Sequence, residues 1–131
     1  MNLPNDLKYT KTHEWLRMEG DTAVVGLTDY AQEQLTDIIF ADLPEIGKHY
    51  DASAEITSVE SVKAVGYINA PLEGTIEAVN QALKDEPEKI NQDPYGEGWL
   101  LKIKPDNAQE ADNLLSSDQY KAFLESEENK E

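Results

Sequence analysis

Short runs in which hydrophobic and polar residues alternate occupy the first two thirds of the chain, and they predict β-strands. Residues 15–19 and the valine-rich residues 22–27 flank Gly20-Asp21, an arrangement typical of a β-hairpin. Further strands are predicted downstream, at residues 38–43, 54–59, 64–68, 75–80 and 99–104.

The remaining segments predict helices and one long loop. Thr28 is placed to cap the N-terminus of a short helix that ends at Leu35. Residues 81–98 are polar and interrupted by proline and glycine, so we expect a loop there. Near the C-terminus hydrophobic residues recur at helical spacing, and Ser116 with Gln119 forms a capping-box pattern.

Together these elements predict a small all-β core, a sandwich or flattened barrel of short strands, with a short internal helix and helices at the C-terminal end. The length suits a single domain over residues 1–131. Residues 126–131 are rich in charge and are expected to fray.

The charge balance narrows the choice of partners. Asp and Glu number 27 against 11 Lys and Arg, which gives a formal charge of −16. Such a field repels nucleic acid and anionic membranes and favours a basic face on a partner protein. The chain has no apolar run long enough to span a membrane and no signal-peptide or transit-peptide pattern, so we expect a cytoplasmic protein.

No arrangement typical of an independent active site is found in the sequence. The absence of cysteine excludes disulfides, zinc–thiolate sites and thiol catalysis. His13 and His49 are not spaced as metal ligands, so we predict no metal site. No serine lies in a nucleophile-elbow pattern. We therefore expect a protein that is not an enzyme.

One lysine lies between two predicted strands. Residues 56–65 read Ile-Thr-Ser-Val-Glu-Ser-Val-Lys-Ala-Val, which places Lys63 at a tight turn where a modifying enzyme has access to it. Spacing alone favours a plainer interpretation, because an exposed lysine on a hairpin is usually only a solubilising charge.

The segment Ser58-Val59-Glu60-Ser61-Val62-Lys63-Ala64 resembles the lipoylation motif of glycine cleavage H proteins. The resemblance runs in the same order from about Tyr9 to Leu124. It includes residues 9–15, 26–32, 43–47, 91–99, 114–115 and 120–124.

This resemblance implies that Lys63 carries lipoic acid in amide linkage at a hairpin tip. It implies a lipoyl-domain-like barrel-sandwich hybrid of two small antiparallel sheets. It also implies a monomeric carrier that takes an aminomethyl group from the pyridoxal-phosphate glycine decarboxylase to the tetrahydrofolate-dependent aminomethyltransferase, and then passes electrons to dihydrolipoamide dehydrogenase. A lipoate ligase or a lipoyl/octanoyl transferase would modify the lysine.

The same resemblance suggests roles for three other residues. Glu60 is expected to help the ligase recognise the site. In the family the loaded arm folds back into a cleft, where the match around His13-Glu14-Trp15 makes Glu14 a contact for the amine. Tyr67 stands where a second acid is common, and its phenol offers a hydrogen bond without a charge.

Other positions depart from the family pattern or have no site role. Ala52-Ser53 replaces a usual Gly-Asp turn, and Thr57 replaces a common glycine. The aromatic residues Trp15, Trp99 and Phe40 are expected in the core.

Several alternatives remain open from the sequence. A lipoyl domain of a 2-oxoacid dehydrogenase typically has Asp-Lys-Ala and an Ala/Pro-rich linker, whereas Val62 precedes the lysine here. A biotin carrier would have methionines around the lysine. An acidic interaction module with no prosthetic group is a third interpretation. A carrier that relays lipoyl groups to other enzymes is a fourth, because it keeps the same fold and the same lysine.

Overall fold

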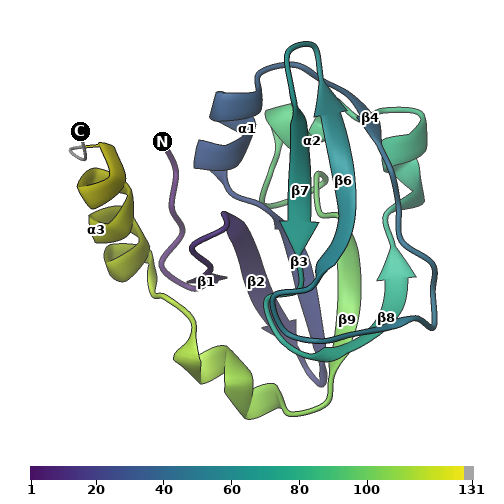
Figure 1. The fold of residues 1–131 in the computed structure, drawn as a ribbon, viewed down its shortest axis with the longest axis vertical. Coiled ribbons are helices and arrows are strands. Elements are labelled where there is room, and N and C mark those ends of the chain that lie inside the picture. Colours follow the sequence, from purple (N-terminus) through teal and green to yellow (C-terminus); the bar gives the residue numbers. More distant parts are fainter. Residues whose placement is uncertain (129–131) are drawn as a thin grey trace.

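The protein is built from two antiparallel β-sheets that pack face to face, as a computed structural model describing residues 1–128 shows (Figure 1). The larger sheet has the strand order β1-β2-β3-β9-β8-β5, and the smaller has the order β4-β6-β7. The strands are β1 (Lys8–Tyr9), β2 (Glu14–Glu19), β3 (Thr22–Leu27), β4 (Ile38–Ala41), β5 (His49–Tyr50), β6 (Glu55–Ser61), β7 (Val65–Asn69), β8 (Gly74–Val79) and β9 (Leu101–Pro105). The predicted all-β core of two small antiparallel sheets is confirmed.

Helices connect and flank the sheets. They are α1 (Asp29–Leu35), η1 (Gln81–Lys84), α2 (Lys89–Gln92), η2 (Ala108–Asn113) and α3 (Ser117–Glu128). The predicted cap of α1 is confirmed, since the Thr28 hydroxyl accepts a hydrogen bond from the Ala31 amide at 3.1 Å. The capping box is confirmed as well: the Ser116 amide donates to Gln119 Oε1 at 2.9 Å, and the Gln119 amide donates to Ser116 Oγ at 3.2 Å.

The prediction of one long loop over residues 81–98 was wrong. This segment contains η1 and α2, each four residues long. Leu83 and Ile90 anchor these turns because both side chains are fully buried in the core. One buried residue per short helix leaves no periodic pattern in the sequence, so tertiary packing decided the local structure.

The two faces of the larger sheet bury different clusters. Leu16, Val25 and Ile103 face the smaller sheet, where they meet Val59 and Ile68 in the main core. The opposite face carries the second cluster, in which α3 packs against the sheet (Figure 1). That cluster contains Tyr9, Trp15, Val24, Tyr120 and Leu124.

The expectation of core aromatic residues holds for Trp15 but not for Phe40. Trp15 is fully buried, and its indole N–H donates to the Pro94 carbonyl at 2.9 Å. Trp99 is half-buried at the edge of the same cluster. Phe40 is 52% exposed, because a register shift in the edge strand β4 turns both Ile39 and Phe40 away from the core.

Helix α3 continues through Glu128. It therefore includes part of the segment 126–131 that the sequence predicts to fray, and residues 129–131 lie outside the described part. Among residues 1–128, no helix has the length and apolar character needed to cross a membrane.

The substituted turn before β6 places a serine in a conformation that favours glycine. Ser53 has φ 71°, in the left-handed region. Its amide donates to the Ala70 carbonyl at 2.8 Å, so the turn is held in this conformation. Thr57 is buried, and its hydroxyl donates to the Asp42 carbonyl, which joins β6 to the segment after β4.

Ser53→Gly is expected to raise the free energy of unfolding by about 1 kcal/mol, because glycine adopts positive φ without a Cβ clash. Ala52→Gly is the matched control. Since Ala52 has no positive φ, the same loss of a side chain there should lower stability or leave it unchanged. Urea unfolding of the three proteins measures both effects, and equal stability of Ser53→Gly and wild type would show that the turn is unstrained.

Candidate functional site

Lys63 lies at the tip of the β6–β7 hairpin, which projects at one end of the molecule (Figure 1). The Ser61 hydroxyl organises the turn, because Oγ accepts from the amides of Lys63 at 3.3 Å and Ala64 at 3.0 Å. The Val62 amide donates to the Asp37 carbonyl at 3.0 Å, which ties the tip to the segment before β4. These bonds hold the Lys63 backbone in one position.

The Lys63 side chain is exposed and makes no ion pair or side-chain hydrogen bond with any residue in the range 1–128. Its amine therefore has no protein partner to give up on becoming an amide. The prominence of the tip also leaves room for an enzyme to reach the amine from several directions. These observations fit a lysine that is covalently modified.

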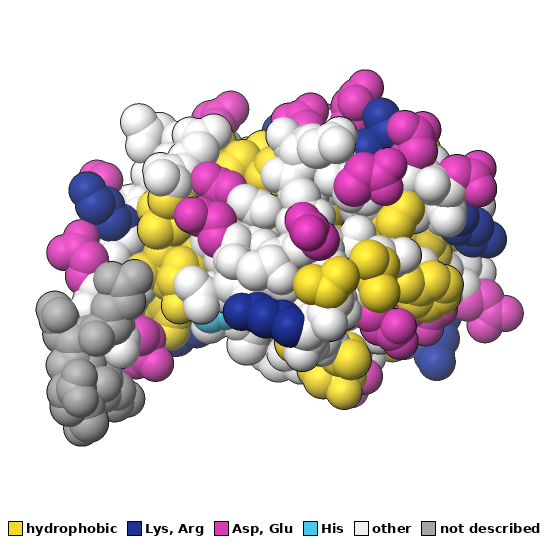
Figure 2. Space-filling view, turned by 90° about the horizontal axis from the view of Figure 1, so that it is seen from above, with side chains coloured by type: hydrophobic (Ala, Val, Ile, Leu, Met, Phe, Trp, Pro, Cys, Tyr) yellow, Lys and Arg dark blue, Asp and Glu magenta, His cyan; other side chains and the backbone are white. Residues whose placement is uncertain are grey.

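An apolar patch lies at the tip. Figure 2 shows hydrophobic side chains gathered on this end of the molecule. The tip patch consists of Ile39, Phe40, Val62 and Val65, all of which are exposed. Glu60 lies within it, since it pairs with Phe40 on β4 and with Val65 on β7. Exposed apolar groups around a single acid are typical of a surface that another protein contacts.

A hollow of about 340 Å³ runs between α1 and β7. It is lined by nine residues: Thr12, His13, Leu27, Tyr30, Ala31, Gln34, Leu35, Gly66 and Tyr67. Gly66 allows the Leu35 side chain to pack closely against β7 in this hollow, because a Cβ at this position would lie 2.7 Å from Leu35 Cδ1. Tyr67 is 57% exposed along its wall. The hollow thus begins on the strand that leads away from Lys63.

Glu14 lies in a second hollow of about 280 Å³, which shares Thr12 with the first. The Glu14 side chain is fully buried. Its Oε1 accepts from the hydroxyls of Thr10 at 2.5 Å and Thr12 at 2.6 Å, and its Oε2 accepts from the Asn69 amide at 3.0 Å. Burial raises the pKa of the Glu14 carboxyl, and these hydrogen bonds oppose that shift.

His13 borders the first hollow in a constrained conformation. Its φ is 74°, and its Nδ1 lies 2.8 Å from the Tyr120 hydroxyl. Burial lowers the pKa of the imidazole, which favours the neutral ring at pH 7. A neutral ring, tilted by 41° against Tyr30 at 4.9 Å between centroids, adds no positive charge to the hollow.

The predicted site residues therefore occupy two regions. Lys63 and Glu60 lie together at the tip, whereas Tyr67 and Glu14 lie in adjoining hollows and do not share one. The sequence analysis missed Thr10 and Thr12, which cover the Glu14 carboxylate. The alternate spacing Thr10-x-Thr12-x-Glu14 is a weak signal for this arrangement, because hydroxyls at such positions are common on exposed loops.

Comparisons with known proteins point to one family. The family model described as glycine cleavage H-protein matches residues 7–127. A glycine cleavage system H protein of Psychrobacter sp. (strain PRwf-1) is 52% identical over 124 residues, which cover 94% of this chain and 98% of that protein. The corresponding protein of Geobacillus kaustophilus is 48% identical, with 95% and 98% covered. A crystal structure of a glycine cleavage system H protein from Mycobacterium marinum superposes with a TM-score of 0.85 at 38% identity, covering 93% of this chain and 98% of the other.

Proposed function

The chain belongs to the glycine cleavage H-protein family, and from this membership we propose that it carries lipoic acid on Lys63 and shuttles an aminomethyl group between the enzymes of glycine cleavage. Members of this family are carriers rather than catalysts. The proposed partners are the pyridoxal-phosphate glycine decarboxylase, the tetrahydrofolate-dependent aminomethyltransferase and dihydrolipoamide dehydrogenase. The observation that carries the proposal is the free Lys63 amine on a backbone fixed by Ser61.

The residues around Lys63 fit a lipoyl group. When attached, the group supplies a dithiolane, a strained disulfide that exchanges readily and carries both the one-carbon cargo and electrons. The chain has no cysteine that would trap the arm. The hollow beside Gly66 and Tyr67 offers the arm an apolar wall along β7. This strand leads away from the tip and is about 13 Å long from Val65 to Asn69.

We propose that the tip patch and Glu60 form the surface that the lipoate-attaching enzyme contacts. The exposed apolar side chains of the patch would be desolvated in such a complex, and Glu60 would pair with a basic group of the enzyme. The patch lies beside Lys63 on the same hairpin and on β4, so an enzyme that approaches the amine from that side contacts it.

We propose that Glu14 supplies negative charge for the amine of the cargo. The hydroxyls of Thr10 and Thr12 donate hydrogen bonds to the carboxylate. Each hydroxyl oxygen can therefore accept a hydrogen bond from an incoming ammonium. Thr12 is exposed and lines both hollows, which makes it the point of approach. Tyr67 lines the way to this point and adds a hydrogen-bond acceptor and a ring face, but no charge.

Tyr67→Asp tests whether charge along this path matters. The variant is expected to slow the release of ammonia and formaldehyde from the loaded protein several-fold, since a charge-assisted bond would add about 1 kcal/mol of binding. Release is measured by the appearance of formaldehyde over time. Tyr67→Asn is the matched control, because it loses the ring without adding charge. Equal lifetimes for wild type and Tyr67→Asp would show that this residue does not hold the amine.

The carrier function is tested with the decarboxylase. Lipoylated protein should support glycine–bicarbonate exchange only when the pyridoxal-phosphate decarboxylase is added, and protein without the lipoyl group should not support it. Exchange of labelled bicarbonate into glycine is the measurement. Exchange by the isolated protein would contradict the carrier role, whereas failure of the lipoylated protein with an active decarboxylase would contradict the assignment to this pathway.

A further inference from the structure

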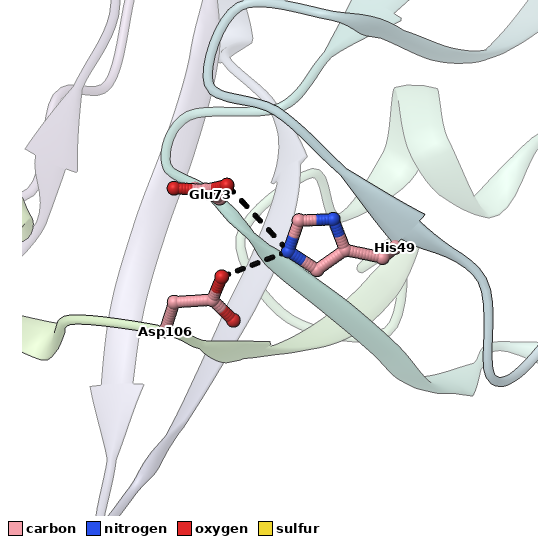
Figure 3. A group of neighbouring side chains, drawn as sticks. All are labelled: His49, Glu73 and Asp106. Atoms are coloured by element: carbon pink, nitrogen blue, oxygen red, sulfur yellow. Dashed lines mark hydrogen bonds and ion pairs between the residues drawn. The ribbon is translucent and has the colours of Figure 1, made fainter.

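An imidazole and two carboxylates converge at the end of the larger sheet that lies away from the Lys63 tip. His49 Nε2 lies 2.8 Å from Asp106 Oδ2 and 3.7 Å from Glu73 Oε2. Figure 3 shows both carboxylates directed at this nitrogen, Glu73 from just before β8 and Asp106 from just after β9. One potential ligand atom from each of the three residues lies within 4.8 Å of the others. No other group of this kind is found among the residues that the structure describes.

The backbone holds these three residues in register. His49 lies on β5, Glu73 directly precedes β8, and Asp106 directly follows β9. These strands are neighbours in the larger sheet. Gly74 pairs with both Tyr50 and Pro105, and the Asp106 amide donates to the Glu73 carbonyl at 2.9 Å. The three side chains are therefore presented from a fixed frame rather than from loose loops.

We propose that His49, Glu73 and Asp106 bind one divalent transition-metal ion of the zinc type. An imidazole nitrogen suits Zn²⁺ better than Mg²⁺ or Ca²⁺, while two carboxylates supply the charge that such an ion requires. Zinc–ligand distances of about 2.0–2.2 Å place neighbouring donors about 3.4 Å apart in a tetrahedral site. The two distances around Nε2 bracket that value, so small side-chain rotations complete the geometry.

The binding step is a replacement at one nitrogen. The ion takes the place of the Nε2 proton, which leaves to solvent, and each carboxylate contributes one oxygen. Water fills the remaining position, because the three side chains are 42–48% exposed. An exposed site with three protein ligands binds less tightly than a closed structural site with four.

The surroundings favour a cation. The charge of Asp51 also acts on the His49 imidazole, and the whole chain carries a formal charge of −16. This general field attracts any cation weakly, so the proposal requires an affinity that depends on the three ligands and not on charge alone. The ion would link edge strand β5 to β8 and β9, and would thereby stabilise the folded chain by mass action.

The test is a calorimetric titration of the full-length protein with Zn²⁺ after treatment with a chelator, in excess Mg²⁺ to occupy diffuse sites. We expect one Zn²⁺ per chain and a rise in Tm. His49→Gln and Asp106→Asn should each weaken binding at least about tenfold. Asp51→Asn is the matched control, because it removes a nearby charge but no ligand, and it should change the affinity less than about threefold. Thermal unfolding without Zn²⁺ identifies variants whose fold has been altered.

A second measurement does not depend on variants. On adding Zn²⁺ to the wild type, the ring nitrogen resonances of His49 should shift, while those of His13, whose Nδ1 is hydrogen-bonded to the Tyr120 hydroxyl, should not.

Two results would overturn the proposal. Equal loss of Zn²⁺ affinity in Asp51→Asn and Asp106→Asn would show diffuse electrostatic attraction in place of ligation. Unchanged His49 resonances at saturating Zn²⁺ would overturn it as well.

Discussion

Coexpression with a lipoate ligase is expected to add one lipoyl group to the wild-type protein and none to Lys63→Arg. The backbone hydrogen bonds of the tip come from Ser61 and not from the lysine side chain, so the variant should fold normally. Arginine keeps the positive charge but offers no primary amine for amide formation. Intact mass and peptide mapping measure the change, and the loss should be complete.

Two controls show whether the loss of lipoylation is specific to Lys63. Lys84→Arg removes another exposed lysine, and full modification of that variant would show that the substitution itself does not impair expression or recognition. Thermal unfolding of Lys63→Arg should agree with wild type within about 0.5 kcal/mol, as expected for an exposed position. A lipoyl group on the Lys63→Arg protein would move the attachment site elsewhere and remove the basis of the carrier assignment.

Substitution of Glu14 should separate its structural contribution from its charge. Glu14→Ala leaves the hydroxyls of Thr10 and Thr12 and the Asn69 amide without their acceptor, whereas Glu14→Gln retains a polar group of the same shape. Both variants lack the charge. We therefore expect Glu14→Ala to be about 2 kcal/mol less stable than Glu14→Gln in urea unfolding. Both should release the cargo faster than wild type, because neither holds a carboxylate beneath Thr12.

The pH dependence gives an independent check. Burial raises the pKa of Glu14 in the folded protein above its value in the unfolded chain, so the folded state binds this proton more tightly. The resulting stability is fully present below the unfolded pKa and is lost as pH rises through the folded pKa. Glu14→Gln cannot titrate, so its stability relative to wild type should improve from pH 4 to pH 7. A difference that does not vary over this range would show that the carboxyl is not desolvated.

The sequence predicted correctly those elements whose conformation is determined by residues close to them in the chain. The hairpin around Gly20-Asp21 and the Thr28 cap depend on neighbouring residues, and both are found as expected. The short helices η1 and α2 and the outward turn of Phe40 depend on packing and on a strand bulge, which no nearby residue encodes.

The site could be predicted only in part for the same reason. Lys63 is proposed as the lipoyl site from its motif, and its turn is formed by adjacent residues. The separation of Glu14 from Tyr67 depends on how β2 and β7 lie in different sheets. Likewise, His49, Glu73 and Asp106 are far apart in the chain and meet only where three strands end together, so histidine spacing gave no indication of them.

The position of β9 in the larger sheet has a consequence for biosynthesis. Strand β9 pairs with β3 on one side and β8 on the other, so it alone joins the two halves of that sheet. A growing chain has already exposed the β6–β7 hairpin before residues 101–105 are made. Most contacts among the described residues join positions far apart in the sequence, so we expect closure of the larger sheet around β9 to come late in folding. The turn that holds Lys63 is formed by residues made early, whereas the larger sheet against which the β6–β7 hairpin packs is completed only after residues 101–105 have been synthesised.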